Sequence, residues 1–312
     1  MTLVIASSNQ SPWEIIGKRV RQGISPLELL KEAGLDWTVD KVQYQYEYKG
    51  EIKKSSKYAL VRSSDSCELT TTTDDWEPVQ NAEAFNFFTD FVKAGDMEMD
   101  LTNSICNGRI VWALAKVKES FTLFGEDRVE SNLLFTLPHE YGRSIDIRFT
   151  PIRPICGNSL VLALTRKGDL SVRINHRKKF DAEVAKKALG IAHHRLDAYR
   201  KNAEFLGARR ARDEQLKEFF MRVFPSVSEE KKELKLSRPA KLALDQLETQ
   251  PGAHFAKGSW WQAYNAATFT IDHLILKDPE KRLFSSWYGA NRTKKIKALE
   301  TAIEMAELSG AL

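Results

Sequence analysis

The feature that most constrains the fold is a series of short, strand-like segments that follow one another in the first half of the chain. They are Gly108–Val117, Phe121–Phe124, Asn132–Leu137 and Ser144–Thr150. Each is rich in β-branched and aromatic residues, and turn-forming residues separate them at Glu126-Asp127, Pro138–Glu140 and Gly142. Links this short join antiparallel neighbours, because parallel neighbours need a long crossover connection. The sequence therefore predicts an antiparallel sheet.

Helical and further strand-like segments precede this sheet. The spacing of apolar residues predicts short helices within Ile15–Ala33 and a helix over Ala82–Lys93, with Asn81 as its N-cap. Between these helices, alternation predicts strands over Trp37–Tyr48, Tyr58–Arg62 and Thr70–Thr73. A turn is expected at Lys49-Gly50. The predicted helix is expected to pack on the sheet.

The second half of the chain is predicted to be mainly helical. After a short strand over Leu170–Asn175, a long helix is expected from Asp181 to about Phe224. Three further helices are predicted, over Ala240–Leu247, Trp260–Leu276 and Thr293–Leu308. The predicted fold class is α+β: an antiparallel sheet with a helix packed on it, followed by a long basic helix and a C-terminal helical region. We expect three parts: a helical segment over 1–35, the α+β core over 36–224, and the helical region over 225–312.

Composition places the chain among ordinary globular proteins. Of its 312 residues, 42% are hydrophobic and 29% are charged. No run approaches the ~18 consecutive apolar residues of a membrane span, and the first ten residues lack the pattern of a secretory signal. The three cysteines are dispersed, which is typical of reduced thiols. We therefore expect a cytoplasmic protein without a membrane partner.

The positive charge of the chain is concentrated in one segment. The net charge of the whole chain is +5, whereas residues 165–222 alone carry +8. A basic segment on an otherwise balanced chain is typical of a protein that binds a polyanion. A solvated helix surface is the alternative explanation.

Several strings of the sequence resemble a known family. They are Glu77–Phe85, Asn107–Ala115, Thr150–Arg153, Cys156–Leu160, Trp261–Thr268 and Ser286–Gly289. These strings resemble the phage/plasmid-like protein family, a domain of unknown function. The resemblance implies an origin in a bacteriophage, prophage or plasmid and supplies no reaction. By analogy of fold, the predicted order of elements is also similar to the core of single-strand annealing proteins.

The candidate nucleic-acid-binding residues are mainly the cations of the basic segment. They would contact phosphates without reading sequence. The main set is Arg166, Lys167, Arg173, His176, Arg177, Lys178, Lys179, Lys186 and Lys187, with Arg109 and Arg153 at the sheet edge as secondary candidates.

Aromatic residues could supplement these cations by stacking on bases. The candidates are Tyr44, Tyr46, Tyr48 and Tyr58, of which the first three would share one face of a strand. The alternative is that these rings pack within the sheet. A second cluster, Arg209-Arg210-Ala211-Arg212, is expected on a helix surface beside acidic residues.

The sequence carries no strong catalytic motif. His193, His194 and Asp197 have a spacing that could bind a metal ion, but no further ligand is identifiable. Two other arrangements are conceivable catalytic sets. They are a Cys156 nucleophile with His139 or His176 and Asn158, and a carboxylate set of Asp127, Glu140 and Asp146. There is no P-loop, G-x-G-x-x-G or H-E-x-x-H string, so we predict neither a cofactor, a metal nor ATP hydrolysis.

The sequence favours a factor that binds single-stranded DNA without sequence preference and promotes annealing or recombination. Such a phage or mobile-element protein would act in the bacterial cytoplasm and assemble into a ring or filament of identical chains. One alternative is a host-interaction protein, of the anti-defence or takeover type, that binds a host protein. The other is a metal-dependent nuclease.

Overall fold

A large antiparallel sheet forms the centre of the molecule. The computed structural model describes residues 12–86, 97–154, 158–159, 171–174, 197–226 and 236–309. The strands of this 7-stranded sheet are β1 (Lys18–Arg19), β5 (Met97–Ile105), β6 (Ile110–Leu123), β7 (Asp127–Pro138), β8 (Ile145–Arg153), β9 (Asn158–Ser159) and β10 (Ser171–Ile174). They lie in the order β1-β5-β6-β7-β8-β10, with β9 also paired to β8. The predicted antiparallel sheet is confirmed, and β6 runs through two of the predicted strands.

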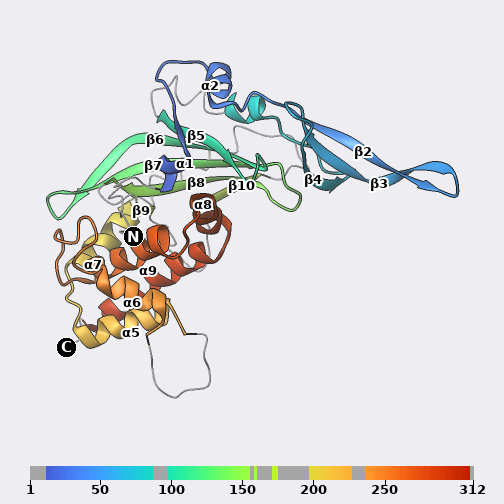
Figure 1. Cartoon of the computed structure of the whole chain (residues 1–312). Helices are drawn as coiled ribbons and strands as arrows, with labels where there is room; N and C mark the ends of the chain where they lie inside the picture. Colours follow the sequence, from blue (N-terminus) through green and yellow to red (C-terminus); the bar gives the residue numbers. More distant parts are fainter. Residues whose placement is uncertain are drawn as a thin grey trace, which may run out of the picture.

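Both faces of this sheet are buried. On β6, Val111 and Ala113 belong to one apolar core, whereas Trp112 and Leu114 belong to another on the opposite face. Helix α2 (Pro26–Ala33) and the helical residues 81–86 cover the first face, and α1 (Pro12–Ile16) and α8 (Pro279–Tyr288) contribute to the core on the second. Figure 1 shows the sheet between α2 above and the C-terminal helices below. Burial on both faces explains why β7 is almost continuously apolar from Leu133 to Pro138.

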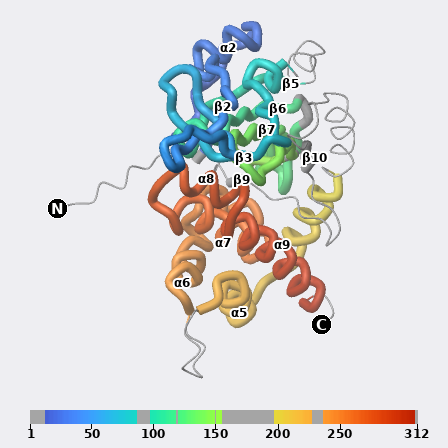
Figure 2. Tube along the Cα trace, turned by 90° about the vertical axis from the view of Figure 1, so that its right-hand side faces the viewer, coloured from blue at the N-terminus to red at the C-terminus, as the bar shows by residue number. Residues whose placement is uncertain are grey.

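The C-terminal helices form a layer with its own core. They are α5 (Asp213–Val223), α6 (Arg238–Asp245), α7 (Trp260–Phe269), the π-helix η1 (Thr270–Leu274), α8 and α9 (Ala290–Ser309). Trp260 and Tyr264 from α7 pack with Phe219 and Phe220 from α5. This core therefore draws on residues from both sides of position 225, where the sequence suggested a boundary. Figure 2 shows the layer stacked beneath the strands, and the α+β fold class is confirmed.

The prediction of one continuous helix reaching Phe224 is wrong. Residues 197–207 are helical, but the chain then runs extended before α5 begins. Here the Ala211 amide donates to the Gly258 carbonyl (3.0 Å) and the Trp260 amide donates to the Arg209 carbonyl (3.1 Å). The cluster at Arg209–Arg212 is consequently an extended link paired to the start of α7 and not a helix surface. Tertiary hydrogen bonds of this kind override local helix propensity.

The side chain of Asn81 does not cap the helix that it was expected to start. The helical residues begin at Asn81 itself. Its buried amide donates to the Leu35 carbonyl (2.8 Å), and its side-chain oxygen lies 2.9 Å from Nε2 of His139. Asn81 thus joins the N-terminal segment to the end of β7. Burial of its polar side chain is compensated by these bonds.

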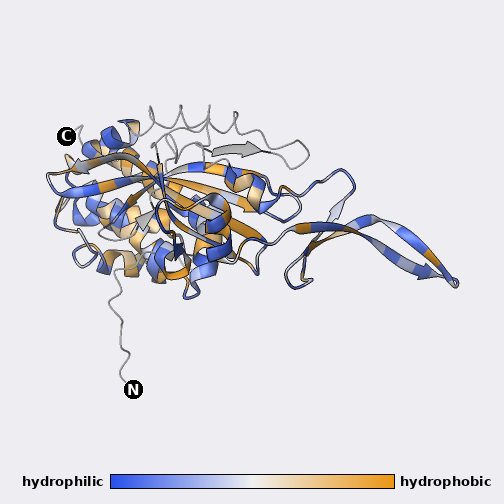
Figure 3. Cartoon of the chain, turned by 90° about the horizontal axis from the view of Figure 1, so that it is seen from above, coloured by the Kyte–Doolittle hydropathy of each residue, from blue (hydrophilic) through white to orange (hydrophobic). Residues whose placement is uncertain are grey.

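A second sheet carries a projecting hairpin. Its strands β2 (Val39–Tyr48), β3 (Glu51–Arg62) and β4 (Glu68–Thr73) lie in the order β2-β3-β4. The predicted turn at Lys49-Gly50 is confirmed, and both residues have the positive φ that a tight hairpin turn favours. Strand β4 pairs only with residues 57–61 of β3. Residues 44–56, here called the arm, therefore form a two-stranded ribbon, which extends away from the body in Figures 1 and 3.

A buried ion pair connects the sheet to the helical layer. The carboxylate of Asp127, at the start of β7, accepts hydrogen bonds from Nε of Arg153 (2.8 Å) and from the indole of Trp261 (3.0 Å). The Arg153 guanidinium also lies 5.8 Å from the Trp261 ring centroid. Three elements (β7, β8 and α7) meet at this carboxylate. Removing one partner would leave an unpaired charge in the interior.

We expect Arg153→Met to lower the free energy of unfolding by about 3–5 kcal/mol, because Asp127 would stay buried without its cation. Urea denaturation followed by circular dichroism measures the change. The matched control is Arg128→Met, because Arg128 pairs with Glu130 with 63% of its side chain exposed, and an exposed pair contributes about 0–1 kcal/mol. Equal stability of the two variants would contradict this role of Asp127.

Candidate nucleic-acid interface

Most of the predicted phosphate-binding residues lie outside the described residues. These are Arg166, Lys167, His176, Arg177, Lys178, Lys179, Lys186 and Lys187. The backbone of Arg173 lies in β10, opposite Asp146 of β8. The role of these basic residues in binding nucleic acid stays a prediction that rests on the charge of the segment.

The expectation that Arg153 contacts nucleic acid is wrong. Its side chain is only 1% exposed and is paired with the buried carboxylate of Asp127. Strand β9 pairs with the end of β8, so Arg153 is not at a sheet edge either. A guanidinium enclosed in this way cannot reach a phosphate.

Arg109 lies at the surface, in the turn between β5 and β6. Its side chain is 44% exposed, and its Nη1 is 3.7 Å from the Glu140 carboxylate. In the same turn, the Asn107 carbonyl accepts a hydrogen bond from Arg62, the last residue of β3 (3.0 Å). Arg109 therefore lies beside the base of the projecting hairpin.

The arm begins where the pairing of β2 with β3 becomes irregular. Gln43 pairs with Tyr58, but Gln45 pairs with Lys54, so β3 contains two additional residues at this point. The Gln43 side chain donates to the Ser55 carbonyl (2.9 Å) within this bulge. Such bulges bend a strand and increase its twist. The bulge thus sets the direction in which the arm leaves the three-stranded sheet.

Exposed tyrosines and lysines lie on one face of the arm. Tyr46 and Tyr48 alternate along β2, and both are 53% exposed. Lys53 is the cross-strand partner of Tyr46. The ammonium groups of Lys49 and Lys53 lie 5.3 and 5.4 Å from the Tyr48 ring centroid. Aromatic rings interleaved with cations are the arrangement with which proteins hold single-stranded nucleic acid.

The other two candidate tyrosines are held by the sheet. The Tyr44 hydroxyl donates to the carboxylate of Glu68 in β4. Tyr58 lies under the Lys41 ammonium, 4.8 Å from its ring centroid. A hydrogen bond from its hydroxyl to Asp74 raises the pKa of Tyr58. Only Tyr46 and Tyr48 of the four therefore offer rings on the free part of the hairpin.

The residues considered for catalysis have other partners. Asp127, Glu140 and Asp146 are ion-paired with Arg153, Arg143 and Arg148, respectively. Within the described ranges, no three histidine, cysteine or carboxylate side chains come together as a metal site. His139 is buried against Asn81, and Asp197 is exposed. His176, His193, His194 and Cys156 lie outside the described residues, as does the side chain of Asn158.

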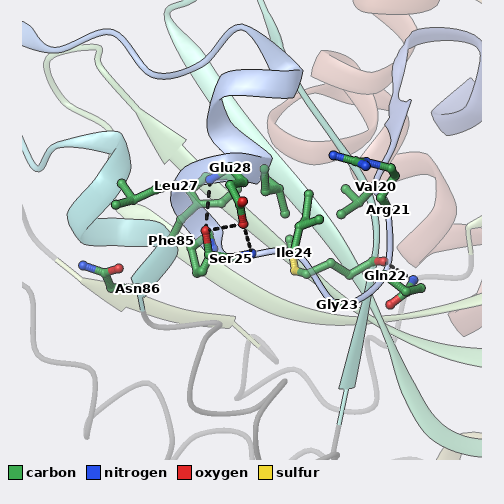
Figure 4. Close-up of a pocket in the computed structure, with 13 residues that line it drawn as sticks. Val20, Arg21, Gln22, Gly23, Ile24, Ser25, Leu27, Glu28, Phe85 and Asn86 are labelled. Carbon is green, nitrogen blue, oxygen red and sulfur yellow. Dashed lines mark hydrogen bonds between the residues drawn. The ribbon is translucent and has the colours of Figure 1, made fainter.

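An apolar cavity of about 550 Å³ lies beside α2. Figure 4 shows Ser25 and Glu28 at its wall, bonded to each other. The Glu28 carboxylate accepts hydrogen bonds from the amide (2.8 Å) and hydroxyl (2.7 Å) of Ser25, and these bonds lower the pKa of Glu28. Phe85 and Asn86 complete the wall just before the undescribed residues 87–96. Of the described polar groups at this wall, Ser25 and Glu28 cap the helix, and Gln22 donates to the Met99 carbonyl (2.9 Å).

The chain belongs to the family described as domain of unknown function DUF932, whose model matches residues 68–302. No curated protein and no solved structure shows significant similarity to the chain. The match includes the large sheet from β5 onward and the helical layer, whereas the arm precedes it. None of the described helices is long and apolar enough to cross a membrane.

The sequence contains a local pattern of tyrosines and lysines that identifies the arm, although the net charge of this half of the chain does not reveal it. Tyr46, Tyr48, Lys49 and Lys53 lie close together around a hairpin turn, in the half of the chain with a negative net charge. Because that half is acidic overall, its average hides a local group of cations. Alternation of tyrosine with polar residues, followed by Lys-Gly and a lysine pair, is the pattern that identifies it.

At the base of the hairpin, Asp65 is expected to titrate with a pKa of about 2. The Arg62 guanidinium donates to both carboxylate oxygens (2.8 and 2.6 Å), and these bonds lower the pKa from the ordinary 3.8. The stabilisation is complete above pH 3.8 and is lost as the pH falls toward 2. NMR titration of the carboxyl carbon measures the pKa.

The Arg62→Gln variant should raise the pKa of Asp65 toward 3.8, and the Cys67 amide, which also donates to this carboxylate, should keep it somewhat lower. The control is Arg21→Gln, because Arg21 pairs with Glu32 on a different element. An Asp65 pKa that stays low in Arg62→Gln would show that Arg62 is not its cause.

Proposed function

We propose that this protein binds single-stranded DNA without sequence preference and promotes its annealing or recombination without nucleotide hydrolysis. The observation that carries the proposal is the arm, where exposed Tyr46 and Tyr48 lie beside Lys49 and Lys53. Stacking on a ring tolerates any base, and an ammonium neutralises any phosphate. An origin in a phage, prophage or plasmid and action in the bacterial cytoplasm belong to the same proposal.

The geometry of the arm supports this function over a structural role. A two-stranded ribbon has no second layer to cover its faces and is marginal on its own in water. Its tyrosines nevertheless lie at the surface, where they contribute little to the core. Exposure of large apolar groups on a projecting element is typical of a binding surface.

The net charge of +8 on residues 165–222 supports the same partner. Together with the arm, this segment supplies the electrostatic attraction that non-specific binding requires. Annealing needs phosphate contacts that leave the base edges accessible for pairing. Backbone contacts combined with stacking on a few rings meet this need.

Fluorescence anisotropy with a labelled oligothymidylate across a salt series tests the proposal. We expect Tyr46→Ala and Tyr48→Ala each to weaken binding by about 1–3 kcal/mol, with the salt slope unchanged. Replacing Lys49 and Lys53 by Gln should reduce the slope of log affinity against log salt by about 0.7 for each phosphate that the protein no longer neutralises. Reversing Lys178, Lys179, Lys186 and Lys187 to Glu should abolish binding.

The arm offers a matched control in Ile52, which is 75% exposed and lies opposite Glu47 on the other face. Ile52→Ala should bind like the wild type, and Tyr46→Phe should retain most of the affinity because the ring remains. If the wild type does not bind the oligonucleotide at low salt, the proposal fails. The exposed arm would then point to a host protein as the partner.

We further propose that identical chains assemble in a ring or filament on the strand, because annealing factors hold many nucleotides in register. Sedimentation velocity with and without a long oligothymidylate measures the assembly. The expected result is a species of several chains that grows with strand length. A single chain bound to a long strand at saturating protein would contradict this arrangement.

A further inference from the structure

Three arginines line a small cavity at the end of the large sheet where the hairpin is attached. The cavity has a volume of about 260 Å³ and lies where the β7–β8 loop and β8 meet the end of α8 and the first turn of α9. Its charged and polar lining consists of Arg143, Ser144, Asp146, Arg148, Tyr288 and Arg292. Arginine outnumbers carboxylate by three to one in this lining, and all three arginines are half-buried.

The ring of Tyr288 orients two of the guanidinium groups. The Cζ atoms of Arg143 and Arg148 lie 4.7 and 5.8 Å from the centroid of this ring. The Tyr288 hydroxyl donates to Oγ1 of Thr136 (2.7 Å), which fixes the ring against β7. Arg143 also lies over Phe284, 5.0 Å from its centroid. Stacked guanidinium groups lose little further freedom when they bind a ligand.

Arg143 keeps donor capacity for a ligand. Nε of Arg143 donates to Glu140 (2.9 Å), whereas its two terminal nitrogens make no hydrogen bond to any described residue. Arg148 pairs with Asp146 and donates to the Trp287 carbonyl (3.0 Å), so its position is fixed from both sides. A guanidinium has five N–H donors, and one carboxylate does not use them all.

We propose that this cavity binds a phosphomonoester, that is, a terminal phosphate dianion. Planar guanidinium groups match the oxygens of a phosphate with paired hydrogen bonds, and several of them together favour a doubly charged group. The volume accommodates a phosphate with part of its sugar and is below the usual range of pockets for a whole drug-sized ligand. The buried Trp287 closes one side, so a chain end fits better than a continuous strand.

The same phosphate could belong to a free nucleotide or to the 5′ end of a strand. The second source rests on the function proposed above, whereas phosphate binding itself does not. The residues of the cavity lie within the family match over 68–302, and the arm lies outside it. The two sites share no residue, so each can be mutated without changing the other.

Two titrations on the full chain test the proposal. Calorimetry compares thymidine 5′-monophosphate with thymidine at equal ionic strength, and only the monophosphate is expected to bind. Fluorescence anisotropy then compares the affinity for a 5′-phosphorylated oligothymidylate with the affinity for its 5′-hydroxyl counterpart. Each titration is repeated with thymidine 5′-monophosphate or thymidine as the competitor. If the source is a strand end, the phosphorylated form should bind at least about tenfold more tightly, and the monophosphate should compete away that difference.

The variants are Arg143→Gln and Arg292→Gln, which leave the Arg148–Asp146 pair in place. Each is expected to weaken phosphate binding by about 10- to 100-fold, the usual effect of removing a hydrogen bond to a charged group. Arg128→Gln is the control, since Arg128 is an exposed arginine remote from the lining, and it should bind like the wild type. Thermal unfolding of each variant separates loss of binding from loss of folding.

The outcomes distinguish this inference from the proposed function. Binding of the monophosphate without binding of either oligonucleotide supports the cavity and overturns DNA binding. Equal binding of both oligonucleotides, with no binding of the monophosphate, supports DNA binding and overturns the phosphate site. Binding of the monophosphate that persists in Arg143→Gln and Arg292→Gln also overturns it, because the phosphate would then lie elsewhere.

Discussion

The buried carboxylate of Asp127 is the interaction on which the joining of the two layers depends. Taking this charge out of water costs several kcal/mol, and only partners with good geometry can offset that cost. Here the partners come from β8 and α7, through Nε of Arg153 and the Trp261 indole. Since Trp261 also packs in the core of the helical layer, the register of the sheet and the position of α7 are set by the same atoms.

A second buried pair acts within the helical layer in a similar way. Lys295 of α9 is paired with Asp272 in the π-helix η1, and both side chains are almost completely enclosed. Burial lowers the pKa of Lys295, while the nearby carboxylate opposes that shift. An extra residue in a helical turn shifts the side chains that follow it, and η1 places Asp272 toward α9. This contact thus links α9 to η1 inside the helical layer, and removing either partner would leave an unpaired buried charge.

Periodicity predicted the parts of the fold in which local pattern and tertiary environment agree. Strands β2, β6, β7 and β8 follow from alternation and turn residues, and α2 lies within the segment predicted to form short helices, Ile15–Ala33. Strand β5 was not predicted because acidic residues, Asn103 and Ser104 lower its average β propensity. The strand nevertheless pairs with β1 and β6, and its apolar side chains are buried. The helix break after residue 207 also depends on a distant element, because Arg209 and Ala211 form backbone hydrogen bonds with the start of α7.

The candidate sites show the same limit. Tyr46 and Tyr48 could be found from sequence because a hairpin keeps neighbours in the chain close in space. The arginine cavity could not, since Arg148 and Trp287 are separated by 139 positions and only the packing of α8 against the sheet brings them together. Arg153 was misassigned because its partner is also distant in the sequence. The residues around an arginine do not show whether its side chain faces solvent or a buried aspartate. The sign of a charge can be obtained from sequence, but its function depends on the partner that tertiary structure supplies. A surface charge is free to attract a polyanion, whereas a buried charge must be paired for the protein to fold.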